Sequence, residues 1–155
     1  MKRESNKIKC YVCGKVIGKK VPTGIYEHGI PRTRTVLKDN GVNILSLSLA
    51  DTTEYGLLRL IVNDPETGRK KLAESGFSTM LTDILIIKIT HKSGSLQGLI
   101  QILSEKDVNV EYMYGLSIDG EKAFVVLKAS DLNDAKKVLE DCGVETLTAN
   151  EISNF

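Results

Sequence analysis

The residues with the clearest chemical potential form a short loop, THKSGSLQG at residues 90–98, between an apolar β-branched run and an amphipathic segment. Gly94 would let the backbone turn tightly and approach a ligand without interference from a Cβ. Free N–H groups at the start of the following helix would suit a carboxylate. Lys92 adds positive charge, and Ser93 or Ser95 is expected to cap the helix when no ligand is bound. An ordinary helix N-terminus with a glycine in its turn is the plainer interpretation of the same residues.

A second group with chemical potential is the C-x-x-C pair Cys10 and Cys13, which resembles one half of a zinc knuckle. Tetrahedral zinc needs four ligands, and this pair supplies two. His28 is a possible third ligand, but no second C-x-x-C follows, and Cys142 is expected in the apolar stripe of a helix. We therefore expect no metal and no other cofactor, and keep a zinc-knuckle adaptor as an alternative.

The sequence contains no convincing set of residues for catalysis or for RNA binding. The two histidines are 63 positions apart, and no nucleophile motif or functional carboxylate pair accompanies them, so we predict that the protein is not an enzyme. KAFVVL at 122–127 partly echoes the RNA-reading strand of RRM domains, but only Phe124 occupies an aromatic position of that motif. With a net charge of +1, no nucleic-acid partner is expected. A ferredoxin-like RNA- or protein-binding module remains the alternative function.

Composition and the N-terminus favour a cytoplasmic protein. The chain has 155 residues, 41% of them hydrophobic and 26% charged. Its first ten residues, MKRESNKIKC, lack the apolar region of a secretory signal, and no apolar run is long enough for a membrane span. Three cysteines, an odd number, fit a reducing compartment better than a disulfide scaffold. We therefore expect no membrane partner.

Internal repetition is the most informative feature of the chain. VLKDNGVNI at 36–44 aligns with ILSEKDVNV at 102–110, at an offset of 66. NDPETGRKKLAESGF at 63–77 aligns with SDLNDAKKVLEDCGV at 130–144, at an offset of 67. The same order with a nearly constant offset indicates that one structural unit has been duplicated.

The second copy predicts a complete βαββαβ unit. Strands are expected at 84–90, 109–118 and 122–129, the last two joined by a tight turn at Asp119-Gly120, and a short final strand at 145–148. A helix over 95–106 is expected to bury one face, and a helix capped by Asp131 is expected to end at Gly143. The expected apolar stripes are Leu96, Leu99, Ile100 and Leu103 in the former helix, and Leu132, Ala135, Val138, Leu139 and Cys142 in the latter.

The first copy follows the same pattern from residue 36, with Asp64-Pro65 at a helix start. Upstream the match fades, because residues 25–29 occupy the loop position and the face Ile30, Thr33, Arg34 and Leu37 is a poor apolar stripe. The predicted fold is α+β, with two ferredoxin-like βαββαβ units packed side by side and the first degraded at its N-terminal part. Residues 1–35 are interpreted as an atypical N-terminal arm, 36–82 as the remainder of unit 1, 83–150 as unit 2 and 151–155 as a tail. The arm is either genuine divergence or the product of a reading-frame error.

One succession of elements in this chain consists of a strand, a short loop with Gly, an amphipathic helix and then "VNI" at the start of a second strand. This succession is similar to the ACT domain. LSLSLADTTEYGLLRLIVNDPE, followed by VNVEYMYG, resembles in particular the small stand-alone tandem ACT proteins of prokaryotes. The likeness covers about residues 36–150. It implies two ACT-like units that form a non-catalytic regulatory or sensor protein and bind a free amino acid at the interface between ACT units.

The resemblance also implies which residues bind the ligand: the loop after the first strand and the start of the second strand of the neighbouring unit. Ser93 stands where the family commonly has proline, and no loop is recognisable in the first copy. The implied ligand-binding residues are His91, Lys92, Ser93, Gly94, Ser95 and Leu96, with Asn43, Ile44 and Leu45 in the first copy and Asn109 and Val110 in the second.

The sheets also predict how the protein associates. Each unit is expected to expose sheet edges, and Tyr112 and Tyr114 lie on one strand face. We therefore expect a homodimer.

Overall fold

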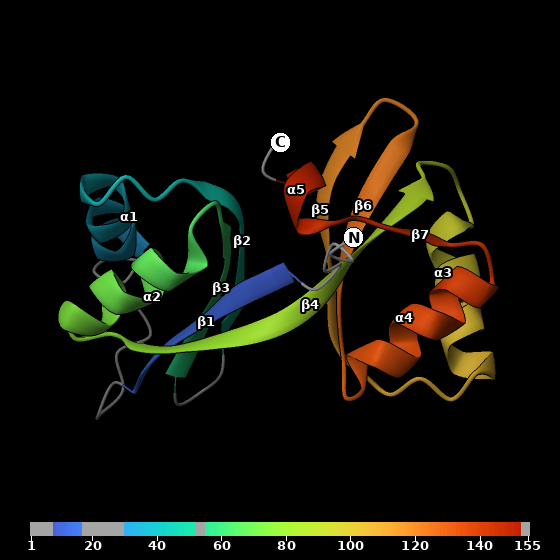
Figure 1. Ribbon diagram of the computed structural model, residues 1–155, viewed down its shortest axis with the longest axis horizontal. Coiled ribbons are helices and arrows are strands. Elements are labelled where there is room, and N and C mark those ends of the chain that lie inside the picture. Colours follow the sequence, from blue (N-terminus) through green and yellow to red (C-terminus); the bar gives the residue numbers. More distant parts are fainter. Residues whose placement is uncertain (1–7, 17–29, 52–54, 153–155) are drawn as a thin grey trace, which may run out of the picture. The chain divides into compact units, whose positions relative to one another are not determined.

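The computed structural model describes residues 8–16, 30–51 and 55–152, which form two compact units (Figure 1). One unit is built on residues 9–82 and the other on residues 83–155. Each has the βαββαβ order that the sequence predicts for the second copy. The predicted α+β class with two ferredoxin-like units is therefore confirmed.

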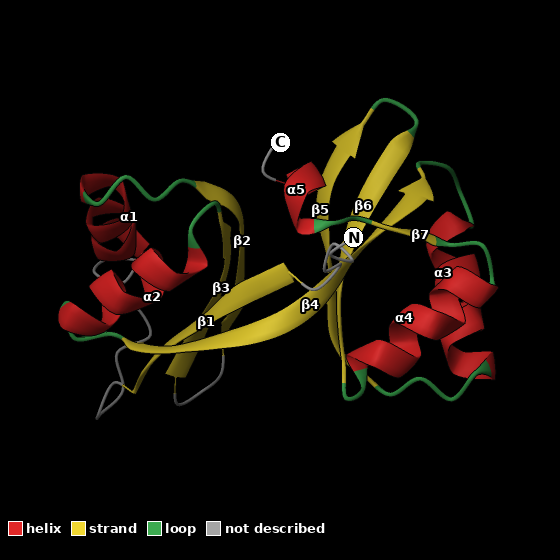
Figure 2. Ribbon diagram, viewed as in Figure 1, coloured by secondary structure: helices red, strands yellow, loops and turns green. Residues whose placement is uncertain are grey.

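The first unit contains the strands β2-β3-β1 and, next to β1, the first residues of β4, and its two helices cover one face of this sheet (Figure 2). The helices bury Thr33, Leu37 and Leu72 against a cluster that includes Leu60 and Phe77. Thr33 is only 1% exposed, so the weak stripe of the first helix has a buried polar residue where an apolar one is usual. The elements are β1 (Ile8–Val16), α1 (Ile30–Asp39), β2 (Ile44–Asp51), β3 (Tyr55–Val62), α2 (Pro65–Glu74) and the first residues of β4 (Ser78–Thr90). The segment 1–35 thus contributes β1 and the beginning of α1.

The second unit contains an antiparallel sheet in the order β7-β4-β6-β5, which is the ferredoxin-like order. Helices α3 and α4 bury Leu99, Leu103, Ala135 and Leu139 against one face of this sheet. The hairpin predicted at Asp119-Gly120 is present, since β5 ends and β6 begins on either side of it. The elements are β4, α3 (Ser95–Glu105), β5 (Val110–Asp119), β6 (Lys122–Ala129), α4 (Leu132–Asp141), β7 (Glu145–Thr146) and α5 (Ala149–Ile152).

The duplication extends to the hydrogen bonds that end the helices. At the end of α1 the Val42 N–H donates to the Leu37 carbonyl at 2.9 Å, and at the end of α3 the Val108 N–H donates to Leu103 at 2.9 Å. Both leucines are buried. This is the Schellman pattern, in which a hydrophobic contact accompanies the closing bond. The same offset of 66 that aligns the letters therefore aligns the backbone geometry.

One position in this motif differs between the copies. The turn after α1 uses Gly41 with φ 69°, whereas the turn after α3 uses Asp107 with φ 53°. A left-handed backbone conformation is unfavourable for residues that have a Cβ, whereas glycine adopts it readily. Aspartate tolerates this conformation better than most other residues. The second copy therefore retains the turn with a less suitable residue.

Two expectations about which side chains are buried prove wrong. Leu99 and Leu103 are buried in α3, but Leu96 and Ile100 are 46% and 47% exposed. The four side chains span an arc of about 100° around the helix, and the core covers only one edge of that arc. Cys142 is also exposed, because it lies at the C-cap of α4, where the helix ends.

Candidate ligand-binding site

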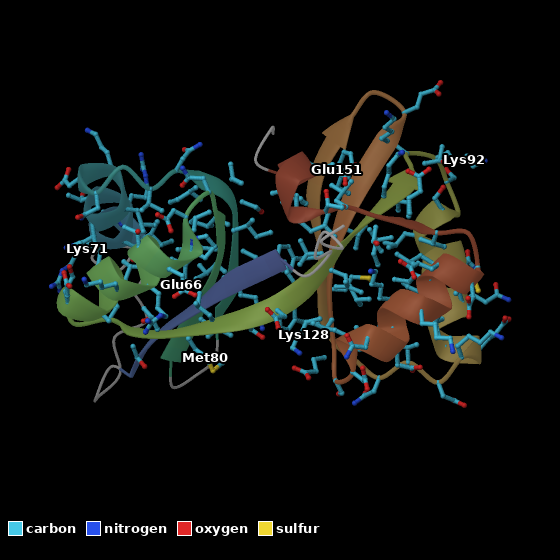
Figure 3. The ribbon with its side chains drawn as sticks, in the orientation of Figure 1. Glu66, Lys71, Met80, Lys92, Lys128 and Glu151 are labelled. Atoms are coloured by element: carbon cyan, nitrogen blue, oxygen red, sulfur yellow. The ribbon has the colours of Figure 1, made fainter. Side chains whose placement is uncertain are left out.

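The loop predicted to bind a ligand joins β4 to α3 and is fixed by its own backbone hydrogen bonds. The His91 N–H donates to the carbonyl of Glu121 at 2.6 Å, which ties the loop to the turn between β5 and β6. The Lys92 N–H donates to Thr90 at 3.0 Å, and the Ser95 N–H donates to the Lys92 carbonyl at 3.2 Å. Lys92 itself lies in this connection (Figure 3). The loop is therefore a compact turn with a defined shape.

Helix α3 starts without a side-chain cap. Gly94 is its N-cap residue, with φ 88°, and no side chain accepts a hydrogen bond from the first turn. The expectation that Ser93 or Ser95 caps this helix is wrong, because the left-handed glycine occupies the cap position and Ser95 is already inside the helix. The N–H groups of Leu96 and Gln97 make no hydrogen bond to any residue that the structure describes. These donors point out of the helix start and can bind an anion.

The helices that follow the return strands begin differently. Asp64 accepts from the Thr67 N–H at 3.1 Å in α2, and Asp131 accepts from the N–H groups of Asn133 and Asp134 at 2.9 and 3.0 Å in α4. Both caps are as the sequence predicts. Hydrogen bonds from Thr67, first from its side chain and then from its backbone, hold the pKa of Asp64 below its ordinary value. Among these three helices, α3 alone has no side-chain acceptor at its start.

A cavity of about 460 Å³ lies beside the loop, within the second unit. Four of the six predicted loop residues line it: His91, Lys92, Ser95 and Leu96. Ser93 and Gly94 do not, although Gly94 shapes the turn. The remaining lining residues are Thr90, Gly115 and the apolar residues Ile89, Leu116, Ala123, Phe124 and Val125. The cavity thus has a polar, positively charged edge at the loop and an apolar interior.

Comparison with known proteins identifies the family to which this fold belongs. A family model described as an ACT domain pair matches residues 28–154. The chain belongs to the ACT domain pair family. No curated protein matches the chain in sequence. Among solved structures, protein BT0572 from Bacteroides thetaiotaomicron has a TM-score of 0.82 and 25% identity, over 97% of this chain and 100% of that one.

Two regulatory subunits of aspartate kinase share the fold at lower identity. The subunit from Thermus thermophilus has a TM-score of 0.61 and 12% identity, over 90% of this chain and 94% of that one. The subunit from Thermus flavus has a TM-score of 0.53 and 14% identity, over 90% and 98% of the two chains. ACT domains are regulatory modules, and these neighbours are regulatory subunits.

Asn109 and Val110 lie far from the loop of their own ACT unit. Val110 pairs with Ala129 at one end of the sheet, whereas Thr90, just before the loop, pairs with Lys122 at the other end. Seven residues of β6 separate the two positions, which corresponds to about 23 Å at roughly 3.3 Å per residue. One unit therefore cannot bring both predicted segments to one ligand.

The two predicted asparagines hold equivalent structural positions in the two units. In the first unit, the Asn43 N–H donates to the side-chain oxygen of Asn63 at 2.8 Å, and the Asn63 N–H donates to the Asn43 carbonyl at 3.1 Å. In the second, the Asn109 side chain donates to the Ser130 hydroxyl at 2.7 Å, and the Ser130 N–H donates to the Asn109 carbonyl at 3.0 Å. Each pair joins the start of the second strand to the end of the third. Residues 44 and 45 are half-buried in β2.

Sequence reasoning missed the part of the cavity that β5 and β6 provide. Two signals could have pointed to it. Gly115 interrupts the alternation of an otherwise regular strand, which often marks a bulge or a close approach, and β5 does have a register shift between Gly115 and Ser117. The turn at Asp119-Gly120 also folds β6 back onto β5, which brings residues 123–125 next to residues 115–118.

The other candidates form no further site among the residues that the structure describes. Cys10 and Cys13 lie in β1, and His28 lies outside the described residues. Within residues 8–16, 30–51 and 55–152, no group of three His, Cys, Asp or Glu side chains could hold a metal ion. The rings of Tyr112 and Tyr114 stack at 6.3 Å with an interplanar angle of 21°, so they share a strand face as predicted. No described helix is long and apolar enough to cross a membrane.

Proposed function

We propose that this ACT pair is a non-catalytic cytoplasmic regulator that binds a free amino acid in the cavity beside residues 91–96. The observation that carries the proposal is that cavity, which has Lys92 at one edge, the uncapped start of α3 beside it and mostly apolar residues in the rest of its lining. Ligand cavities of roughly 300–1,000 Å³ with a few convergent polar groups are typical of small-molecule sites.

Each part of an amino acid has a suitable partner in the cavity. The α-carboxylate would accept from the N–H groups at the uncapped start of α3, where Leu96 lines the cavity, and would lie near the Lys92 ammonium group. The α-ammonium group would donate to the hydroxyl oxygens of Thr90 or Ser95, both of which line the cavity. The side chain of the amino acid would enter the apolar interior.

Regulation would follow from a shift between conformations. A ligand that binds one arrangement of the protein better than another moves the population toward that arrangement, and a partner protein would respond to the change. We further propose a homodimer, in which the second copy supplies the wall that one unit lacks through the strand start at Asn109 and Val110. Light scattering at high protein concentration would reveal a monomer if this part is wrong.

The first experiment is a binding screen of the purified full-length chain against the twenty amino acids, by thermal shift and then calorimetry. At a ligand concentration one hundred times Kd, stabilisation should be about 2.7 kcal/mol. The amide derivative of the best ligand, which lacks the carboxylate charge, should bind much more weakly. If no amino acid at millimolar concentration moves the transition, the proposal fails, and stabilisation by RNA instead would support the RNA-binding alternative.

A matched pair of glycine variants tests the location. Gly94→Val places a β-branched residue at φ 88° and should abolish binding, because the turn that presents the helix start must change. Gly76→Val is the control, since Gly76 has φ 83° at the end of α2 in the other unit and its added Cβ also meets open space. The control should lose similar stability and retain binding. Equal binding by both variants would exclude the loop as the site.

A further inference from the structure

We infer that the cavity selects an amino acid with an apolar side chain, and that Gly115 sets the size of the side chain it accepts. This inference rests on the proposed function. It goes further by naming the class of ligand and by assigning specificity to a residue of β5 outside the loop.

The first observation is the chemistry of the walls. None of the eleven described residues that line the cavity is acidic, and the charged side chain among them is Lys92 at the edge. A lysine or arginine ligand would place its cationic end in the apolar interior without a partner, which is costly. An aspartate or glutamate ligand would have two carboxylates and one lysine to share between them. An apolar side chain leaves Lys92 and the helix start to the α-carboxylate.

The second observation is that side chains from the core of the unit form the interior. Val125 is 6% exposed and belongs to the cluster beneath α3 and α4. Ile89 packs against the same cluster. A ligand side chain that enters here would therefore extend the core and be removed from water, which favours apolar groups at about 25 cal/mol per Å².

The third observation is the position of Gly115. It lies in β5 directly opposite Val125, so a side chain at this position would share the face of Val125. A Cβ built there meets nothing within 4 Å, and the backbone is not in the left-handed region. Neither strain nor crowding at this position requires glycine. What glycine does provide is room in the cavity that it lines.

The test uses graded variants at this position in the full-length protein. Gly115→Val should fold with an unchanged or higher melting temperature, because valine suits a strand better than glycine. It should weaken binding of leucine, methionine and phenylalanine at least 30-fold by calorimetry. Gly115→Ala should shift the preference toward valine over leucine and phenylalanine, a change of selectivity that a purely structural role would not produce.

The control variant is Gly98→Ala. Gly98 lies in α3 near the same loop, its added Cβ also meets open space, and it does not line this cavity. Binding should remain within twofold of the original protein. Apolar ligands that bind Gly115→Val as well as the original protein would overturn the assignment of this cavity.

The outcomes of the ligand screen separate this inference from the proposed function. Binding of valine, leucine, isoleucine, methionine or phenylalanine, but not lysine or aspartate, supports both. Binding of lysine or aspartate in preference to the apolar amino acids overturns the apolar class, while the proposed function stands. Binding of no amino acid at all overturns both.

Discussion

Truncation of two apolar residues in α3 should have very different costs, although the sequence places them on one stripe. Leu103 is 2% exposed and lies in the core cluster of its unit, whereas Ile100 is 47% exposed. Leu103→Ala removes buried methyl groups and leaves a cavity, which costs about 3 kcal/mol within the usual range of roughly 2–5. Ile100→Ala loses about half of the burial free energy of an isoleucine and leaves no cavity, so the cost should be about 1 kcal/mol.

These free energies translate into melting temperatures that are easy to separate. For a chain of this length, 1 kcal/mol corresponds to about 2–4 °C. Leu103→Ala should lower the melting temperature by about 6–12 °C, and Ile100→Ala by less than about 4 °C. Circular dichroism during thermal and urea unfolding measures both. Leu37→Ala, at the equivalent position of the first unit and fully buried, is the matched variant and should cost as much as Leu103→Ala.

Equal losses for Ile100→Ala and Leu103→Ala would refute this reasoning. They would mean that Ile100 is covered in solution, and a dependence of its effect on protein concentration would identify a second copy as the cover.

Three further predictions concern the caps and the strand starts. Asp107 and Gly41 both have positive φ, so glycine suits both positions better than aspartate. In urea titrations, Asp107→Gly should raise the free energy of unfolding by up to about 1 kcal/mol, and Gly41→Asp should lower it by about 1 kcal/mol. A lower free energy of unfolding for Asp107→Gly would contradict this. The folded pKa of Asp64 is lowered by its bonds from Thr67, so its stabilisation is present above pH ~4 and is lost as pH falls below that value. Asp64→Asn should therefore weaken the acid dependence of the melting temperature, and an unchanged pH profile would count against the cap. Asn43→Ala keeps the backbone carbonyl that Asn63 uses, so a loss of ligand affinity of about 1–3 kcal/mol would indicate that this strand start binds the ligand, whereas unchanged affinity would remove Asn43 from the site.

The order of elements could be predicted from the sequence because its signals are local. Asp64 and Asp131 cap helices through bonds to residues two or three positions ahead, and Asp119-Gly120 forms a turn with its own neighbours. The two aligned segments then double the evidence for each element. The weak apolar stripe of α1 also has a local reason, because the polar residue Thr33 occupies a buried position of that helix.

The cavity and the burial of α3 depend on contacts between distant segments, which periodicity does not encode. A stripe that spans about 100° fits a core on either of its edges, and only the packing against the sheet decides that Leu99 is buried and Leu96 is not. Likewise, Gly115 lines the cavity because the register of β5 with β6 places it opposite Val125. The serine caps failed for a different reason, since a left-handed Gly94 took the cap position itself.

The course of β4 has a practical consequence for anyone who tries to separate the two units. The boundary between them falls at residues 82 and 83, inside a strand that continues from Ser78 to Thr90. Domain boundaries usually fall in exposed linkers, where proteases cut and gene fusions are tolerated. Here the boundary offers a protease no linker to cut. Splitting the chain at residues 82 and 83 would give two fragments, each with part of β4. The same constraint applies to recombination between genes, because replacing either unit by a unit from another protein would also replace part of β4.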